Sequence, residues 1–569
     1  MPFRLALLAS TLAAVAVANA LPSPTSLLAG RETVDAHGSW WFHWWVAQAV
    51  SEGASLGHTS LLFFPWGKDV LAHTGGNVLD ALLVLPVRRA LGPEAAWNLL
   101  AFGALATNGL AAGWWARRAG DSAAVAAVAI ATLNPFPLHE LALGRPTQAI
   151  LAPLLVALAL GDRALRELRW RDAALAGAAL ALQGWIYWYA AGFGAVALCV
   201  LAVGRPFGPR LARLAAMGAL SMALTAPVVV PMLSALRTGD VPGLLPVQTW
   251  LAGEPAWRNA QGTEVQLGAL GPWGVAGFVG SRRFVAEGFT LGALGLAAAA
   301  FAPARWIAVA VLGLVLSVGP FPGDVPNPAY LALTAVAPPM ERLYWPVRWL
   351  ALVMAAGIVG IGPAFARAPE RWRGWLAGGV VALAIAEPAA RGVLPVGAWR
   401  PTVHPAFACL AEAEGAVIVL PWGLDQVPLV AQTVHHRPML NGMHERSTSL
   451  VPAEAIAFRR ENAWMDALLT STTDPRAVIP WTEEDEAQAR ALGYRFVVVR
   501  LDRFAEPNNR AGTSHLRRGA LSRLRALAGP PVYQDDTLGI WAPWGGWPAG
   551  CVPSTDRQLS EPPSPKAGR

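Results

Sequence analysis

Residues 31–50 read RETVDAHGSWWFHWWVAQAV, and residues 61–80 read LLFFPWGKDVLAHTGGNVLD. This polar and aromatic stretch directly follows the first apolar segment of the chain. It places an acid, Asp35, among several histidines and a cluster of tryptophans. Function concentrates on loops that a rigid scaffold positions, so this pattern predicts a functional loop at the surface of a membrane.

Composition supports a membrane environment. The chain has 569 residues, of which 54% are hydrophobic and only 14% are charged, and its mean hydropathy is +0.40. Soluble domains carry about 25% charged residues. The net charge of +7 is assigned to membrane topology, because basic residues in such chains mark the cytoplasmic side. No nucleic-acid-binding motif is present, so we expect no nucleic-acid partner.

Apolar runs of about 17 to 25 residues predict membrane spans. The candidates are residues 4–20, 95–116, 122–138, 147–161, 173–187, 189–204, 211–233, 286–302, 306–319, 347–366 and 374–390. With a cytoplasmic N-terminus, every short arginine-rich junction falls on the cytoplasmic side. We therefore expect an α-helical polytopic membrane protein with about 11 spans.

The remaining parts of the chain divide by composition. Residues 1–20 are a first span or signal-anchor; Ala18-Asn19-Ala20 also resembles a signal-peptide cleavage site, and we favour the uncleaved anchor. Residues 21–94 form a first external loop with interfacial helices, one of them at 77–92, and residues 95–390 form the transmembrane bundle.

The C-terminal part changes character. Alternating short β-type runs and helical stretches predict an external α/β domain at 395–550, and residues 551–569 are expected to be a disordered tail. Cys199 lies in an apolar run. Cys409 and Cys551 could pair in an oxidising compartment, but two cysteines so far apart leave the pairing open.

Asp35 has two interpretations. It caps a helix, or it acts as a general base or metal ligand just above the bilayer. Trp40, Trp41 and Trp44, with His43 among them, seat a helix at the interface or stack on a sugar ring.

Two further clusters lie at span ends. His139, Glu140 and Arg145 follow the third span, where Glu140 could be a second carboxylate facing Asp35; the alternative is an ordinary polar loop. Arg342 and Arg348 lie at the mouth of the tenth span, where they either snorkel to lipid headgroups or clamp a phosphate.

The chain lacks the sequence motifs of several other classes of enzyme and transporter. Asp69 lies in a turn beside Lys68 and could be a local ion pair or a substrate contact. The chain has no P-loop, no GxSxG elbow and no HExxH zinc motif. The predicted spans carry no charged residues near their centres, which argues against a secondary transporter.

The order of these motifs resembles bacterial membrane glycosyltransferases of the GT-C type, including proteins related to the YfhO group. The resemblance covers residues 1–390. It is carried by these features: Asp35 before Trp41-Phe42-His43-Trp44-Trp45, the turn Phe63-Phe64-Pro65, Trp97-Asn98, the stretch 139–160, and Arg342, Pro346 and Arg348.

This resemblance implies transfer of a sugar from a polyprenyl phosphate to an envelope glycan, lipid or protein at the external face of the bacterial inner (cytoplasmic) membrane. Asp35 would be the base, supported by Glu140 and His139. Arg145, Arg342 and Arg348 would hold the lipid phosphate. Some relatives need a divalent cation, but the chain lacks a D-x-D or E-x-D at Asp35, so the cofactor stays unknown. The alternative is a catalytically inactive GT-C protein that binds or helps export a lipid-linked glycan.

Overall fold

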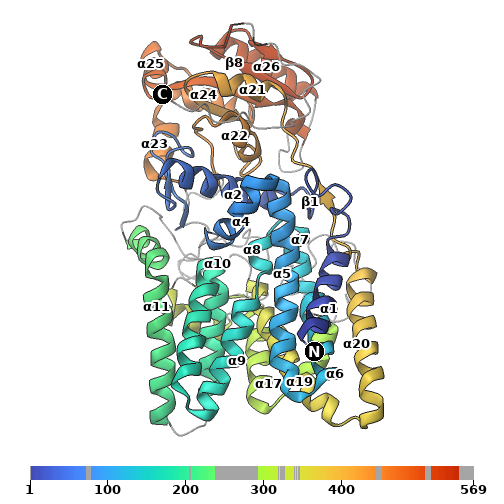
Figure 1. Ribbon diagram of the computed structural model, residues 1–569. Helices are drawn as coiled ribbons and strands as arrows, with labels where there is room; N and C mark the ends of the chain where they lie inside the picture. The colour runs from blue at the N-terminus through green and yellow to red at the C-terminus, as the bar shows by residue number, and fades with distance from the viewer. Residues whose placement is uncertain are drawn as a thin grey trace. The chain divides into compact units, whose positions relative to one another are not determined.

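The computed structural model describes residues 2–71, 78–203, 207–237, 292–317, 319–320, 327–338, 340, 343, 346–443, 451–505, 514–549 and 551 (Figure 1). The chain divides into two compact units. The first comprises Met1–Ala54, Leu71–Ser234 and Gly243–Arg400, and the second comprises Ser55–Val70, Ala235–Pro242 and Pro401–Arg569. The predicted tail beyond residue 551 lies outside the described residues.

The first unit is a helical bundle. Its helices are α1 (Pro2–Ala16), α2 (Val34–Glu52), α4 (Val78–Leu91), α5 (Pro93–Ala116), α6 (Asp121–Thr132), α7 (Pro135–Ala142), α8 (Pro146–Ala149), α9 (Ala152–Glu167), α10 (Trp170–Ala202), α11 (Phe207–Arg237), α16 (Ala293–Ala299), α17 (Ala304–Ser317), α18 (Pro328–Val336), α19 (Leu350–Ala366) and α20 (Glu370–Ala390). Short 3-10 turns are η1 (Arg117–Ala119) and η5 (Pro346–Trp349). A two-residue antiparallel pair joins β1 (Leu28–Ala29) to β4 (Ala398–Trp399).

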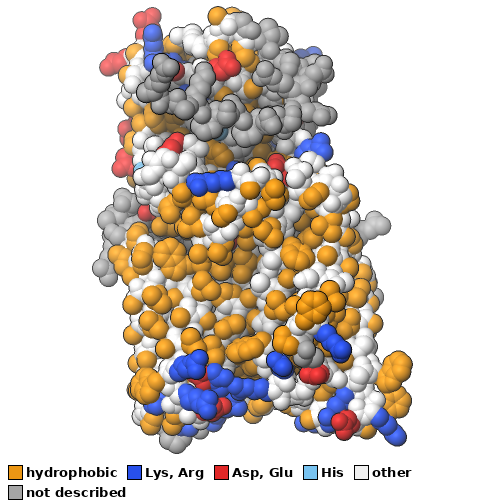
Figure 2. Space-filling model, viewed as in Figure 1, with side chains coloured by type: hydrophobic (Ala, Val, Ile, Leu, Met, Phe, Trp, Pro, Cys, Tyr) orange, Lys and Arg blue, Asp and Glu red, His pale blue; other side chains and the backbone are white. Residues whose placement is uncertain are grey.

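Six helical segments of the described chain are long and apolar enough to cross a membrane, at Pro93–Ala119, Asp121–Ala142, Pro146–Glu167, Trp170–Ala202, Gly208–Pro231 and Pro346–Ala366. Hydrophobic side chains cover the sides of these helices (Figure 2). The protein is therefore a membrane protein. Shorter apolar helices occur at Pro2–Ala16 and Ala304–Ser317.

Helix α10 doubles back on itself. Tyr187 has non-helical angles, φ −152° and ψ 95°. A Cβ placed on Gly194 would lie 2.7 Å from the Leu180 side chain, whereas fourteen residues of straight helix would separate the two by about 21 Å. The two predicted spans at 173–187 and 189–204 therefore occupy two antiparallel arms, and Tyr187 lies at the bend between them.

Helix α1 packs into the bundle through small residues. Ala9 and Ala13 are fully buried. A Cβ on Gly109 would lie 3.4 Å from the Cβ of Ala9, so α1 and α5 approach closely there. Small residues at such contacts let helix backbones come near one another, which is how helices associate in lipid.

The second unit is built on a four-stranded sheet with the order β5-β6-β8-β7. Strand β5 (Ala416–Leu420) is parallel to β6 (Tyr494–Arg500), whereas β8 (Leu538–Trp541) is antiparallel to β6 and to β7 (Tyr533–Gln534). The helices are α21 (Ala406–Glu412), α22 (Leu429–His435), α23 (Ala453–Glu461), α24 (Ala463–Thr470), α25 (Glu483–Ala491) and α26 (Ser514–Ala528), with the 3-10 turn η6 (Leu501–Ala505). The β-type runs of the sequence, at 416–421, 495–500 and 538–543, coincide with β5, β6 and β8.

Residues 55–70 belong to this second unit, although their sequence predicts that they are part of the first external loop. Their hairpin pairs β2 (His58–Thr59) with β3 (Lys68–Asp69). The backbone N–H of Met439 donates to the Leu61 carbonyl, and the Tyr494 hydroxyl donates to the Phe64 carbonyl. Backbone pairing of this kind leaves little trace in local sequence.

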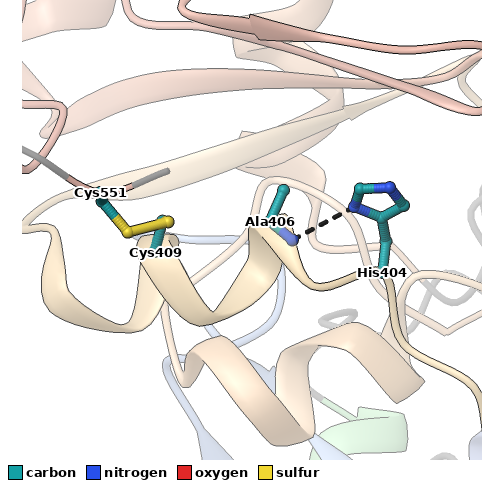
Figure 3. Close-up of a disulfide and its surroundings, with 4 residues drawn as sticks. All are labelled: His404, Ala406, Cys409 and Cys551. Atoms are coloured by element: carbon teal, nitrogen blue, oxygen red, sulfur yellow. Dashed lines mark hydrogen bonds between the residues drawn. A yellow bond between two sulfur atoms is a disulfide. The ribbon is translucent and has the colours of Figure 1, made fainter. Parts of the chain in front are cut away.

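A disulfide joins Cys409, on α21, to Cys551, with the Cα atoms 5.8 Å apart (Figure 3). At the start of α21 the His404 ring accepts a hydrogen bond from the backbone N–H of Ala406. The sequence had left this cysteine pairing open, and the structure resolves it in favour of the bridge. Cys199 is a free thiol.

Candidate active site

The acid singled out first, Asp35, lies in the first turn of α2. Thr33 caps that helix, because its hydroxyl accepts a hydrogen bond from the backbone N–H of Ala36. The same hydroxyl donates to the Leu143 carbonyl at 2.6 Å. The backbone N–H of Arg31 donates to the Ala142 carbonyl. These bonds fix the start of α2 against the turn that follows α7.

Gly144 makes that close approach possible. Its φ is +74°, and an added Cβ would lie 2.2 Å from the Cβ of Ala36. No other residue type fits there without movement of the backbone. The next residue, Arg145, is thereby brought beside the carboxylate of Asp35.

An alternating chain of charges then runs into the bundle. Arg145 Nε donates to Asp35 Oδ2 at 2.7 Å, and Arg145 Nη1 contacts Glu140 Oε2 at 3.3 Å. Arg348 Nε donates to Glu140 Oε1 at 3.0 Å and its Nη2 to Glu140 Oε2 at 3.3 Å. Arg348 Nη1 donates to the Tyr187 hydroxyl at 2.7 Å. Four elements, α2, α7–α8, η5 and the bend of α10, therefore meet in one polar network.

Burial differs along this chain. The side chain of Glu140 is fully buried, those of Arg145 and Arg348 are almost so, and that of Asp35 keeps 36% of its surface exposed. Two carboxylates and two guanidinium groups sum to zero charge. Buried charges are tolerated when they are paired and hydrogen-bonded, as Glu140 is. Asp35 is thus the member of the network that a molecule from outside can reach.

A second buried acid is bound to a residue that lies just after Arg145 in the chain. Asp80, on α4, has no exposed surface. Its Oδ2 accepts a hydrogen bond from the Thr147 hydroxyl and lies 3.5 Å from Nε2 of His43. Since Thr147 is two residues beyond Arg145, this contact fixes the short helix α8, which begins directly after the arginine.

The aromatic residues of α2 pack inside the first unit. Trp41 is fully buried and stacks on Trp45, with ring centroids 6.1 Å apart. Trp40 packs edge-on against Trp97, and the Arg88 guanidinium lies 5.7 Å from its ring centroid. Burial lowers the pKa of Arg88 to about 10, against the opposing effect of the Glu94 carboxylate. Trp44 is also buried. These contacts establish a packing role, and the suggested contact with a sugar stays a prediction.

The other predicted residues are more widely placed. His139 is buried beside Glu140 on α7. Asp69 belongs to the second unit, in β3. Arg342 lies outside the described residues, as does the loop 238–291. The network therefore joins Asp35, Glu140, Arg145 and Arg348 from the predicted set.

The arrangement does not fit a divalent cation. A cation site needs several oxygen ligands that converge on one point. Here Arg145 binds both Asp35 and Glu140, so a guanidinium lies where the metal would have to be. Within the described ranges, no three His, Cys, Asp or Glu side chains gather as metal ligands.

No protein-family model and no curated protein matches this sequence. Solved structures do match. The arabinofuranosyltransferase AftD from Mycobacteria aligns with 95% of this chain at 17% identity and a TM-score of 0.54. The chain has a GT-C-type fold. It spans 42% of the length of the AftD chain.

Two other matches to this GT-C-type fold are more distant. The archaeal oligosaccharyltransferase AglB from Archaeoglobus fulgidus, solved with an inhibitory peptide and a dolichol-phosphate, aligns with 88% of the chain at 14% identity and a TM-score of 0.46, and 69% of AglB is covered. ArnT from Cupriavidus metallidurans, bound to undecaprenyl phosphate, aligns with 94% at 12% identity and a TM-score of 0.40, and 97% of ArnT is covered.

Sequence reasoning missed Tyr187, Asp80 and Thr147. Tyr187 occurs in the aromatic run WIYWY at 185–189, where the helix bends, and such a run between two apolar arms is a usable signal. Asp80 interrupts the apolar face of α4, and a buried acid there needs a partner. Thr147 gave no signal, because threonine is common at the start of helices.

Proposed function

We propose that this membrane protein transfers a sugar from a polyprenyl phosphate to an acceptor of the cell envelope. The GT-C-type fold supports the general kind of reaction. The observation that carries the proposal is the charged network that ends in the partly exposed Asp35. A carboxylate that is partly exposed and held in one orientation by an arginine can be reached by an acceptor hydroxyl and can take its proton.

In the proposed reaction the acceptor oxygen attacks the anomeric carbon of the sugar. Its proton passes to a carboxylate oxygen of Asp35. The bond between the anomeric carbon and the phosphate oxygen breaks, and the polyprenyl phosphate leaves with that electron pair. Attack from the side opposite the phosphate inverts the configuration at the anomeric carbon. The step needs no metal ion, because an arginine can stabilise the charge on the leaving phosphate.

The arginines have distinct parts in this scheme. Arg145 orients Asp35, and Arg348 holds Glu140, which in turn positions Arg145. Arginine is suited to phosphate because its planar fork offers several donors. His139 would support the network from α7. Contacts of Trp40, Trp41, Trp44, His43, Asp69 and Arg342 with the sugar or the lipid remain proposals from the sequence.

The proposed side of the membrane is the external one. Disulfides persist in oxidising compartments, and the Cys409–Cys551 bridge lies in the second unit. The arginine-rich junctions between spans are expected on the opposite, cytoplasmic side of the membrane. Both observations favour an inner membrane protein with a cytoplasmic N-terminus and an external second unit.

A second function has its own support. Both acids of the network are already bound to arginines, and a protein that only binds a lipid-linked glycan, or helps export it, needs no free base. In that case the network serves stability alone. The two proposals differ in whether Asp35 matters for turnover.

The test uses the purified full-length protein in vesicles with polyprenyl-phosphoryl arabinofuranose, the donor type that the name of AftD suggests. We expect Asp35→Asn to lower release of polyprenyl phosphate by 10²-fold or more, since general bases typically contribute about 10²–10⁴-fold. Asp121→Asn is the matched control, because Asp121 is an exposed acid in the first turn of α6. Turnover that Asp35→Asn leaves intact would exclude the proposed base, and donor binding without turnover in the native protein would favour the second function.

A further inference from the structure

A cavity of about 410 Å³ opens between α5, α9 and the first arm of α10. It lies at the other end of that arm from Tyr187, which is seventeen residues from Trp170, or about 25 Å along the helix. Its lining combines two chemistries, the arginines Arg163, Arg169 and Arg171 and the apolar side chains Trp114, Leu160 and Leu175. Neither the fold nor the proposed transfer reaction accounts for it.

The charges of the cavity are unbalanced. Arg163 is bound by both carboxylate oxygens of Asp172, the acid that also lines the cavity. Arg169 contacts Glu167 at 3.2 Å, on an exposed turn. Arg171 has no acidic partner in the part of the chain that the structure describes. Asp172 offsets Arg163 and Glu167 offsets Arg169, so the guanidinium group of Arg171 is left without a carboxylate and is available to a ligand.

The apolar wall decides what kind of anion fits. Trp114 and Leu175 expose nearly half of their surface. A free inorganic phosphate would satisfy the arginines and leave this wall in water. A phospholipid supplies both parts, since its phosphate can meet the guanidinium groups while its acyl chains lie along Trp114 and Leu175.

The position of the cavity in the bundle is consistent with a phospholipid ligand. The arginines lie at the turn between α9 and α10, where two spans end, and Lys and Arg side chains gather at this end of the first unit (Figure 2). Tryptophan favours the interface between headgroups and acyl chains. Arginines that only set topology need no cavity, and Arg371 on α20 is an example of an exposed arginine at a helix end.

We propose that this cavity binds the phosphate-bearing headgroup of an anionic phospholipid. Arg169 and Arg171 contact the phosphate, and Arg163, held by Asp172, forms the fixed base of the cavity. Trp114, Leu160 and Leu175 cover the first carbons of the acyl chains. Basic pockets between spans are known to take such headgroups. The site is separate from Asp35 and does not depend on the proposed reaction.

The experiment measures lipid binding by native mass spectrometry of the full-length protein in a nonionic detergent. Dioctanoyl phosphatidylglycerol is the probe, and dioctanoyl phosphatidylcholine has the same chains without net charge. We expect the double variant Arg169→Gln/Arg171→Gln to weaken phosphatidylglycerol binding roughly tenfold or more, because each substitution removes one arginine contact to the phosphate. The matched control, Arg371→Gln/Arg373→Gln, removes the same charge from α20 and should bind within about twofold of the native protein.

Three outcomes would overturn the proposal. Equal losses in both double variants would mean that the lipid follows net charge alone. Equal binding of phosphatidylcholine would remove the role of the anionic headgroup. Competition by sodium phosphate at the lipid's own concentration would mean that a free anion occupies the cavity. Equal melting temperatures of the variants establish that each is folded. The variant Trp114→Ala keeps every charge, so it should weaken lipid binding and leave phosphate binding unchanged.

Discussion

Glu140 in the membrane bundle and Asp535 in the second unit are both carboxylates with several donors, yet they are held in different ways. Glu140 has no exposed surface and depends on two arginines. Asp535 is one-third exposed and accepts hydrogen bonds from Tyr533 and from the backbone N–H groups of Thr537 and Leu538, with His404 at 2.7 Å. A buried charge without water relies on its charged partners, whereas a surface charge shares its donors with solvent.

Arg348→Met should have the largest effect, because it leaves Glu140 buried with one arginine instead of two. Breaking a buried ion pair from one side costs about 3–5 kcal/mol. Thermal unfolding of the purified protein measures the loss, with Arg371→Met as the exposed control. Adding Glu140→Gln to Arg348→Met should restore much of the stability, since the uncompensated charge is then gone. If the double variant is no more stable than the single one, buried charge is not the reason for the loss.

Gly144→Ala should have the next largest effect. A Cβ there meets Ala36 at 2.2 Å, and the φ of +74° is itself unfavourable for alanine. Together these cost roughly 2–4 kcal/mol and separate Arg145 from Asp35. Gly53→Ala is the matched control, because Gly53 has a φ of +68° at the other end of α2 with nothing within 4 Å. Equal melting temperatures for the two variants would mean that backbone conformation alone matters and that the close approach does not.

The charged network could be anticipated only in part. Asp35, Glu140, Arg145 and Arg348 stand out in the sequence because each interrupts or flanks an apolar run. Their pairing could not be predicted, because the positions of 35, 140 and 348 relative to one another depend on how helices distant in sequence pack. The sequence suggested two acids that face each other, and the structure has Arg145 bound to both.

The sequence predicted the helices of the bundle more completely than it predicted the extent of the second unit. Long apolar runs mark spans directly, since lipid requires helices with all backbone groups paired. The bend at Tyr187 could be predicted from the break between two apolar runs. The place of residues 55–70 in the second unit could not be predicted, because their own side of the links to Met439 and Tyr494 consists of backbone carbonyls, which every sequence carries.

His404→Gln should have the smallest effect and so sharpens the contrast with Arg348. It removes a ring that lies 2.7 Å from Asp535, but the carboxylate keeps Tyr533 and two backbone donors. An exposed pair of this kind contributes about 1 kcal/mol or less. Hydrogen exchange of peptides from 533–541 in the full-length protein measures the change. A loss as large as that of Arg348→Met would mean that burial does not separate the two sites.

The pH dependence of Asp535 supports the same distinction. Burial raises its pKa, but the hydrogen bonds from Tyr533 and the backbone outweigh that and hold the pKa well below its usual range. A depressed pKa stabilises the fold above the unfolded value of about 3.9, and this contribution is lost as the pH falls through the folded pKa. Because Tyr533 and the two backbone N–H groups still donate to Asp535 in His404→Gln, most of this contribution should persist, and the acid loss of stability should begin at nearly the same pH as in the native protein. A loss that begins at higher pH in the variant would instead make His404 the group that keeps Asp535 charged.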